Sequence, residues 1–102
     1  MANKALIKLK IRDTDSIQYE GEVDRISSYN EMGQFDVYPM HANFISIINK
    51  SISLYLHNKL IKKMDIEKAV MKVKKDEAQI FLGIEALLLE EESSFRKIND
   101  QG

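Results

Sequence analysis

The sequence predicts an all-β domain of two packed sheets, because apolar and polar residues alternate with period two in three separate stretches. These stretches are residues 6–12, 51–56 and 78–88. Such alternation places apolar side chains on one face of a strand and polar side chains on the other. Together with shorter candidates they give eight or nine strands, a number that suits two sheets packed face to face.

The first half of the chain adds short strands separated by turns. Residues 13–16 form a polar turn cluster, and residues 17–19 form a short strand that ends near Gly21. Residues 23–29 break strict alternation, which a β-bulge would reconcile with a strand. Residues 30–33 are expected to form a tight connection, with Gly33 free to adopt a positive φ.

A further short strand over residues 35–38 ends at Pro39, and the second half of the chain is more mixed. Residues 57–59 are expected to form a hairpin turn between the strand 51–56 and a strand over 60–65. Residues 66–75 resist this interpretation, because Ile66, Ala69, Val70 and Val73 follow the spacing of an amphipathic helix. From local pattern alone this segment is a short helix.

The strand pattern also predicts which side chains form the core. Apolar residues on the inward faces of the expected strands should be buried together between the two sheets. The predicted core consists of Ile7, Leu9, Ile11, Val23, Ile26, Val37, Ile47, Ile52, Leu54, Ile80 and Leu82.

Composition excludes several classes of protein. The formal net charge is −1, whereas a nucleic-acid-binding domain usually has a clear basic excess. The absence of cysteine excludes disulfides, thiolate metal sites and cysteine nucleophiles. The longest apolar run, residues 86–89, is far shorter than the roughly 20 residues of a membrane span, so we expect a soluble chain.

Catalytic and cofactor sites have little support. The two histidines, His41 and His57, lack the spacing of a metal-binding helix, and the glycines lie too far apart for a phosphate-binding loop. A small enzyme centred on His41, with Asp36 and Ser46 as helpers, remains a rival hypothesis that rests on spacing alone. We therefore expect no catalytic residue, no metal, no cofactor and no small-molecule substrate.

Lysine is concentrated between residues 59 and 75, where seven lysines occur and no aromatic residue does. Binding of single-stranded nucleic acid usually adds aromatic side chains on which bases stack. A solvated sheet face or edge, where lysine blocks unwanted strand pairing, explains the lysines better.

One region carries a more specific pattern. Gly21, Val23 and Ile26 are followed by Gly33, and then by the sequence Tyr-Pro-Met-His-Ala at residues 38–42 before an apolar strand. This pattern resembles the epsilon subunit of bacterial F-type ATP synthases, called delta in mitochondria. Residues 9–48 match the family pattern without a gap. Met40 departs from it, because it stands where the family has a glycine.

The resemblance implies a sandwich of about ten strands in two five-stranded sheets over residues 1–89. It also implies that residues 69–73 are a strand paired with residues 78–82, against their local helical spacing. Only thirteen residues follow Leu89, so the family's two-helix domain is expected to be absent or reduced to a tail over residues 90–102, with one helical turn at 95–98.

The resemblance further implies a non-catalytic rotor subunit that docks on the gamma subunit and on the c-ring at the cytoplasmic face of the membrane. The residues that would face the c-ring are Asn30, Glu31, Met32, Gly33, Gln34 and Phe35. The residues that would contact gamma are Pro39, Met40, His41, Ala42 and Asn43. The alternative is a free-standing β-sandwich that binds another protein, since a fold does not fix a function.

Overall fold

The computed structural model describes residues 5–40 and 43–83, which form seven strands and no helix. The strands are β1 (Ile7–Arg12), β2 (Ile17–Val23), β3 (Arg25–Asn30), β4 (Gly33–Val37), β5 (Phe44–Leu56), β6 (Lys59–Lys74) and β7 (Glu77–Leu82). The all-β prediction is therefore confirmed for the described part of the chain. The division at residue 89 and the helical turn at 95–98 concern residues outside these ranges and stay predictions.

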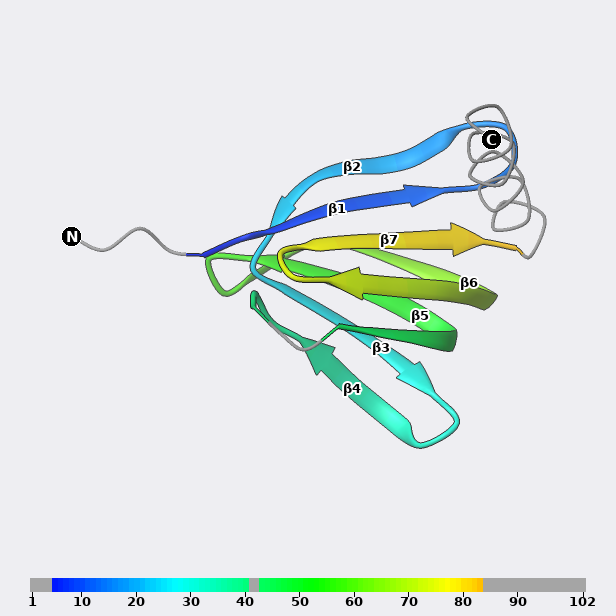
Figure 1. Cartoon of the computed structure of the whole chain (residues 1–102). Coiled ribbons are helices and arrows are strands. Elements are labelled where there is room, and N and C mark those ends of the chain that lie inside the picture. The colour runs from blue at the N-terminus through cyan, green and yellow to red at the C-terminus, as the bar shows by residue number, and fades with distance from the viewer. Residues whose placement is uncertain (1–4, 41–42, 84–102) are drawn as a thin grey trace, which may run out of the picture.

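All seven strands belong to one hydrogen-bonded sheet, in the order β2-β1-β7-β6-β5-β3-β4. Every neighbouring pair is antiparallel except β1 and β7, which run parallel. Figure 1 shows β1, β2 and β7 at the top of the view and β3 and β4 at the bottom, with the long β5 and β6 joining the two layers. The sheet thus folds over on itself and encloses the core of a sandwich.

The expected count of ten strands in two separate sheets is wrong, and the length of β5 and β6 explains why. β5 has 13 residues and β6 has 16, so each passes through both layers instead of ending between them. Their register shifts between Asn49 and Lys50, and Lys50 has a φ of 70°. An irregularity of this kind bends a strand without ending it. The strands expected at 60–65 and 69–73 are accordingly parts of one strand.

Residues 66–75 contain no helix, as the resemblance predicted. Ala69, Met71 and Val73 are buried on one face of β6, so the segment has a strand period beside its helical one. Hydrogen bonding to β5 on one side and to β7 on the other favours the strand conformation over the helix. Pairing over long sequence separations has overridden the local preference.

Other expected boundaries shift by a few residues. Gly21 lies inside β2, paired with Leu9, and does not end the strand. The segment 23–29, where a bulge was expected, is broken at Asp24 between β2 and β3, and the register of β3 with β5 shifts between Ser27 and Tyr29. The hairpin turn after β5 is confirmed, with φ values of 54° at His57 and 65° at Asn58. Two consecutive positive φ values match the twist of the flanking strands.

The core contains nine of the eleven residues predicted for it. The buried cluster consists of Ile7, Leu9, Ile11, Val23, Ile26, Val37, Ile48, Ile52, Leu54, Ala69, Met71, Val73, Ala78 and Ile80. Leu82 is only partly buried at the edge of this cluster. Ile47 was placed wrongly: it is 57% exposed, and its neighbour Ile48 is fully buried in its place.

The turn between β1 and β2 leads to a prediction about pH. The Asp13 carboxylate accepts hydrogen bonds from the backbone N–H groups of Asp15 and Ser16, at 2.9 and 2.8 Å, and from the Gln18 side chain. These bonds, that from Asp15 first, hold the pKa of Asp13 below its ordinary value of 3.8. The turn is thus stabilised in full above pH 3.8, and this contribution is lost as the pH falls through the lowered pKa.

An NMR titration of the side-chain carboxyl carbon is expected to place the midpoint for Asp13 below 3.8 in the folded chain. The same residue in a short unstructured peptide of the same local sequence is the control. A midpoint equal to that of the peptide would show that the backbone bonds do not hold the carboxylate.

Candidate partner-binding surfaces

The first predicted surface is the tip of the β3–β4 hairpin, where the Asn30 side chain fixes the turn. Its Oδ1 accepts the Met32 backbone N–H at 2.8 Å, and its Nδ2 donates to Ser46 Oγ on β5 at 3.3 Å. Gly33 has a φ of 114°, which only glycine adopts readily. The turn prediction is confirmed. The tip presents Met32, which is 89% exposed, on a backbone held by side-chain bonds.

The remaining residues of this predicted surface differ in exposure. Glu31 and Gln34 are exposed, so both are accessible to a partner. Phe35 is half-buried, and its ring meets the ring of Phe44 edge to face, with centroids 6.2 Å apart. Edge-to-face aromatic pairs stabilise packing. Phe35 therefore stabilises the hairpin by packing against Phe44.

The second predicted surface is the connection between β4 and β5, which is fastened to the turn between β6 and β7. The Met40 N–H donates to Asp76 Oδ1 at 3.1 Å, and the Lys75 N–H donates to Asn43 Oδ1 at 2.8 Å. Asp76 also accepts the Lys8 N–H through its backbone oxygen at 2.7 Å. Asn43 thus has a structural role. His41 and Ala42 lie outside the described residues.

Pro39 borders a concave surface of about 400 Å³. Its lining includes Asp24, Arg25, Tyr38 and Pro39. The Arg25 guanidinium lies 3.8 Å from the centre of the Tyr55 ring, a cation–π contact. Pro39 is half-buried, whereas Met40 is 76% exposed. Among the described residues of this predicted surface, Met40 and Asn43 are therefore exposed and Pro39 is half-buried.

Met40 adopts the left-handed backbone conformation that glycine would adopt in its place, with a φ of 64°. That conformation costs an L-residue roughly 1–2 kcal/mol, while glycine loses about 0.5–1 kcal/mol of chain entropy. Met40→Gly is therefore expected to raise the free energy of unfolding by up to about 1 kcal/mol. Chemical denaturation with urea measures the change.

Met32→Gly is the matched control, because Met32 is also a largely exposed methionine and is not among the positive-φ residues. It should lower the free energy of unfolding by roughly 0.5–1 kcal/mol. Equal effects of the two variants would contradict the backbone argument for Met40.

The two predicted surfaces lie at opposite ends of one hairpin strand. β4 begins at Gly33, beside the tip, and ends at Val37, before the connection to β5. Figure 1 shows the β3–β4 turn and the end of β4 well separated in space. A partner at one end therefore leaves the other end accessible.

Sequence reasoning missed an exposed apolar pair directly after Asn43. Ile45 is 68% exposed and Ile47 is 57% exposed, on the outer face of β5. Their partners on β6 are Lys72 and the half-buried Val70. In the sequence, Phe44, Ile45, Ile47 and Ile48 place apolar side chains on both faces of this strand, but they do not indicate which face is exposed.

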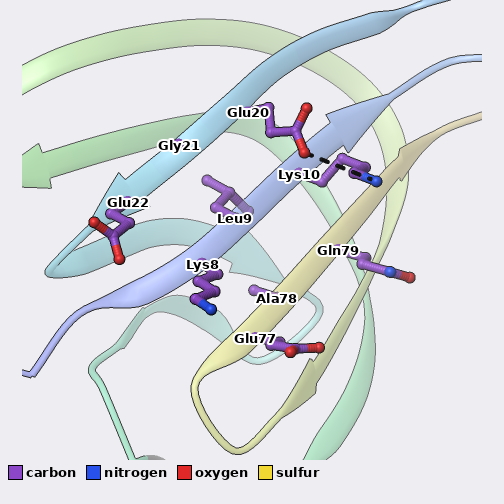
Figure 2. Close-up of a pocket in the computed structure, with 9 residues that line it drawn as sticks. All are labelled: Lys8, Leu9, Lys10, Glu20, Gly21, Glu22, Glu77, Ala78 and Gln79. Carbon is purple, nitrogen blue, oxygen red and sulfur yellow. Dashed lines mark ion pairs between the residues drawn. The ribbon is translucent and has the colours of Figure 1, made fainter.

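A second concave surface, also of about 400 Å³, lies over β2, β1 and β7 (Figure 2). Lys8 stands between Glu22 and Glu77, and Lys10 stands between Glu20 and Gln79, in the registers of the three strands. The Lys10 ammonium is 4.0 Å from the Glu20 carboxylate. Charges that alternate in this way compensate one another, so this surface has the character of a solvated sheet face.

Residues 5–40 and 43–83 bring together no group of three histidine, aspartate or glutamate side chains that could hold a metal ion. The described part of the chain also contains no helix with the length and hydropathy that a membrane crossing requires.

Comparison with known proteins identifies the class to which this sandwich belongs. Residues 6–83 match the family model described as ATP synthase, Delta/Epsilon chain, beta-sandwich domain. This match covers all seven strands, the turns between them and both predicted surfaces. The chain therefore belongs to the delta/epsilon family of ATP synthase β-sandwich domains. No curated protein sequence matches it.

Solved structures show the same fold. A chain of Euglena gracilis mitochondrial ATP synthase matches with a TM-score of 0.70 and 16% identity, over 79% of this chain and 53% of that one. A chain of the central stalk and c-ring structure of Tetrahymena thermophila mitochondrial ATP synthase matches with a TM-score of 0.63 and 8% identity, over 79% and 66%. The protein thus spans about half to two thirds of these relatives.

Proposed function

We propose that this protein is a non-catalytic subunit of the central stalk of an F-type ATP synthase. In this role it sits peripherally at the cytoplasmic face of the membrane and contacts the membrane only through the complex. The observation that carries the proposal is the family match over the whole described sandwich. A packed sandwich suits such a role, because close-packed interiors deform little under load and transmit torque without a cofactor.

The gamma subunit is the proposed partner of the surface formed by Met40, Asn43, Ile45 and Ile47. The two isoleucines follow Asn43 on the outer face of β5, and both are more than half exposed. Exposed apolar side chains that lie next to polar ones are typical of a binding surface. Pro39, His41 and Ala42 are proposed to border this surface, as the family pattern implies.

The c-ring is the proposed partner of the β3–β4 tip. Met32 and Gln34 project from a turn that Asn30 and Gly33 hold in one conformation. A preorganised turn loses little entropy on binding, which favours contact with short polar loops. The tip lies at the other end of β4 from Met40, whereas Ser46, between Ile45 and Ile47, accepts a hydrogen bond from Asn30 at the tip.

Co-expression with the gamma subunit encoded in the same genome, followed by size-exclusion chromatography, tests the proposal. A one-to-one complex is expected, and Ile45→Asp with Ile47→Asp should weaken it at least tenfold, since a charge placed in an apolar contact must be desolvated. Ile17→Asp is the matched control, because Ile17 is 52% exposed on β2, away from β5 in the sheet order.

Loss of the complex in the double variant but not in the control would support the gamma surface. A folded chain that forms no complex with gamma would favour the alternative, a free-standing β-sandwich that binds another protein. Equal weakening by Ile17→Asp would contradict the placement of the contact on β5.

A further inference from the structure

Half of β6 forms an open edge within the described sheet. β7 pairs with β6 only from Ala69 to Lys74, whereas β5 pairs with it from Lys59 to Val73. Among the described residues, positions 59–67 therefore have no partner on the side away from β5, and on the β5 side the register skips Ile61 and Glu67. Alternate N–H and C=O groups of this segment point away from β5, in the arrangement that another strand can complete.

The open edge is held in an extended conformation before any partner arrives. Met64 and Ile66 are partly buried and pack against the core cluster. The ladder with β5 fixes the backbone on the other side, from the turn at His57 and Asn58 onwards. A partner strand would thus bind a preformed template, which reduces the entropy lost on binding.

The side chains of this edge give it an apolar and cationic character. Residues 59–63 are all exposed, and Leu60 and Ile61 are 52% and 44% exposed. Residues 59–67 carry three lysines, Lys59, Lys62 and Lys63, against Asp65 and Glu67. This segment is therefore positive within a chain whose formal net charge is −1.

We propose that the open edge of β6, residues 59–67, binds an extended acidic protein segment by strand addition. Main-chain hydrogen bonds would supply part of the affinity, as in other cases of strand addition. Carboxylates of the added strand would pair with Lys59, Lys62 and Lys63, while its apolar residues would cover Leu60 and Ile61. This inference is independent of docking on gamma, which we assign to the outer face of β5.

Charge selects this occupant over a second copy of the chain. Pairing two copies through residues 59–63 sets lysines of one copy opposite lysines of the other, and like charges across a ladder are destabilising. The outer edge of β2 is a less suitable site for an acidic strand than residues 59–67. It carries Glu20 and Glu22, which would repel such a strand. The other outer strand, β4, has only five residues. The lysines thus disfavour the self-pairing register centred on Ile61, in which Lys59 meets Lys63, and they favour an acidic partner.

Titration of the full chain with a nine-residue acetylated peptide, in which glutamate alternates with valine and threonine, tests the proposal. Amide hydrogen exchange within residues 59–67 is expected to slow at least tenfold on binding, because the added strand protects outward N–H groups. The same peptide with lysine in place of glutamate should not bind. A peptide N-methylated at alternate residues should also fail, since it cannot complete the ladder.

Variants of the chain test whether peptide binding depends on the open edge itself or only on the overall charge of the protein. Lys59→Glu with Lys63→Glu is expected to weaken binding of the glutamate peptide about tenfold or more. Lys74→Glu is the matched control, because Lys74 is an exposed lysine of the same strand at a position that is already paired with β7. The affinity of the Lys74→Glu variant for the peptide should stay within about twofold of the affinity of the unmodified protein.

Several outcomes would overturn the proposal. Protection that appears at β2 or β4 instead of residues 59–67 would do so, and so would equal binding of the N-methylated peptide. Slow exchange of residues 59–67 in the free chain would show that the edge is already occupied. Binding to vesicles of anionic lipid with the same lysine dependence, but without protection of these amides, would assign the edge to a membrane surface.

Discussion

Ile48→Asp is expected to destabilise the folded protein severely, whereas Ile47→Asp, one residue earlier, is expected to have a much smaller effect. Ile48 is fully buried in the core cluster, so an aspartate there must be desolvated without a partner. That costs more than about 4 kcal/mol, a large part of the roughly 5–15 kcal/mol that stabilises a domain. Ile47 is 57% exposed, and its aspartate remains hydrated.

Urea denaturation followed by circular dichroism measures both variants. Aspartate disfavours strands by up to about 1 kcal/mol at either position, and this cost cancels when the two variants are compared. The remaining difference in the free energy of unfolding should exceed about 3 kcal/mol. Similar losses in both variants would contradict the register of β5, and loss in Ile47→Asp alone would restore the core assignment made from sequence.

The misplacement of Ile47 shows the limit of pattern analysis. Residues 44–48 carry apolar side chains on both faces of β5, so the alternation does not say which face is inward. The structure resolves this through the pairing of Ile48 with Ala69 and of Ile47 with Val70. Elsewhere a single apolar face, as in Ile7, Leu9 and Ile11, was sufficient to predict the core.

The number of strands could not be predicted for a related reason. Sequence indicates where a strand pattern is interrupted, but an interruption can end a strand or merely bend it. The irregularity at Asn49 and Lys50 bends β5, and β6 continues beside it through the segment with helical spacing. Whether the chain continues depends on the neighbouring strands, which local sequence does not show.

The candidate surfaces were predicted in part. The tip at residues 30–33 follows from turn chemistry that is visible in the sequence, because Asn30 and Gly33 serve the turn directly. The role of Asn43 was hidden, since its side chain accepts a hydrogen bond from Lys75, 32 residues away. The exposure of Ile45 and Ile47 was hidden too, because it depends on the register of β5.

Asp24 also forms contacts with residues distant in the sequence, so its substitution is expected to lower the stability of the protein. Asp24 occupies the break between β2 and β3 and is only 8% exposed. Its Oδ2 accepts the backbone N–H of His57 at 2.6 Å, and its own N–H donates to the Tyr55 backbone oxygen at 2.9 Å. These bonds join the β2–β3 break to the β5–β6 turn, where His57 already has a positive φ.

Asp24→Ala is expected to lower the free energy of unfolding by about 2–3 kcal/mol. The variant loses a hydrogen bond to a charged acceptor and leaves the His57 N–H without its carboxylate partner. Asp24→Asn keeps an acceptor oxygen and should lose only about half as much. Urea denaturation at neutral pH measures both values, and amide exchange at His57 shows whether the N–H has become exposed.

Asp65→Ala is the control for this prediction, because Asp65 is an exposed aspartate of β6 and its removal should change stability by less than about 0.5 kcal/mol. An Asp24→Ala variant as stable as this control would show that water replaces the carboxylate at no cost. If instead Asp24→Ala loses stability while Asp24→Asn does not, the acceptor oxygen is sufficient without its charge. Comparing Asp24→Ala with Asp24→Asn thus distinguishes the contribution of the hydrogen-bond acceptor from the contribution of the negative charge.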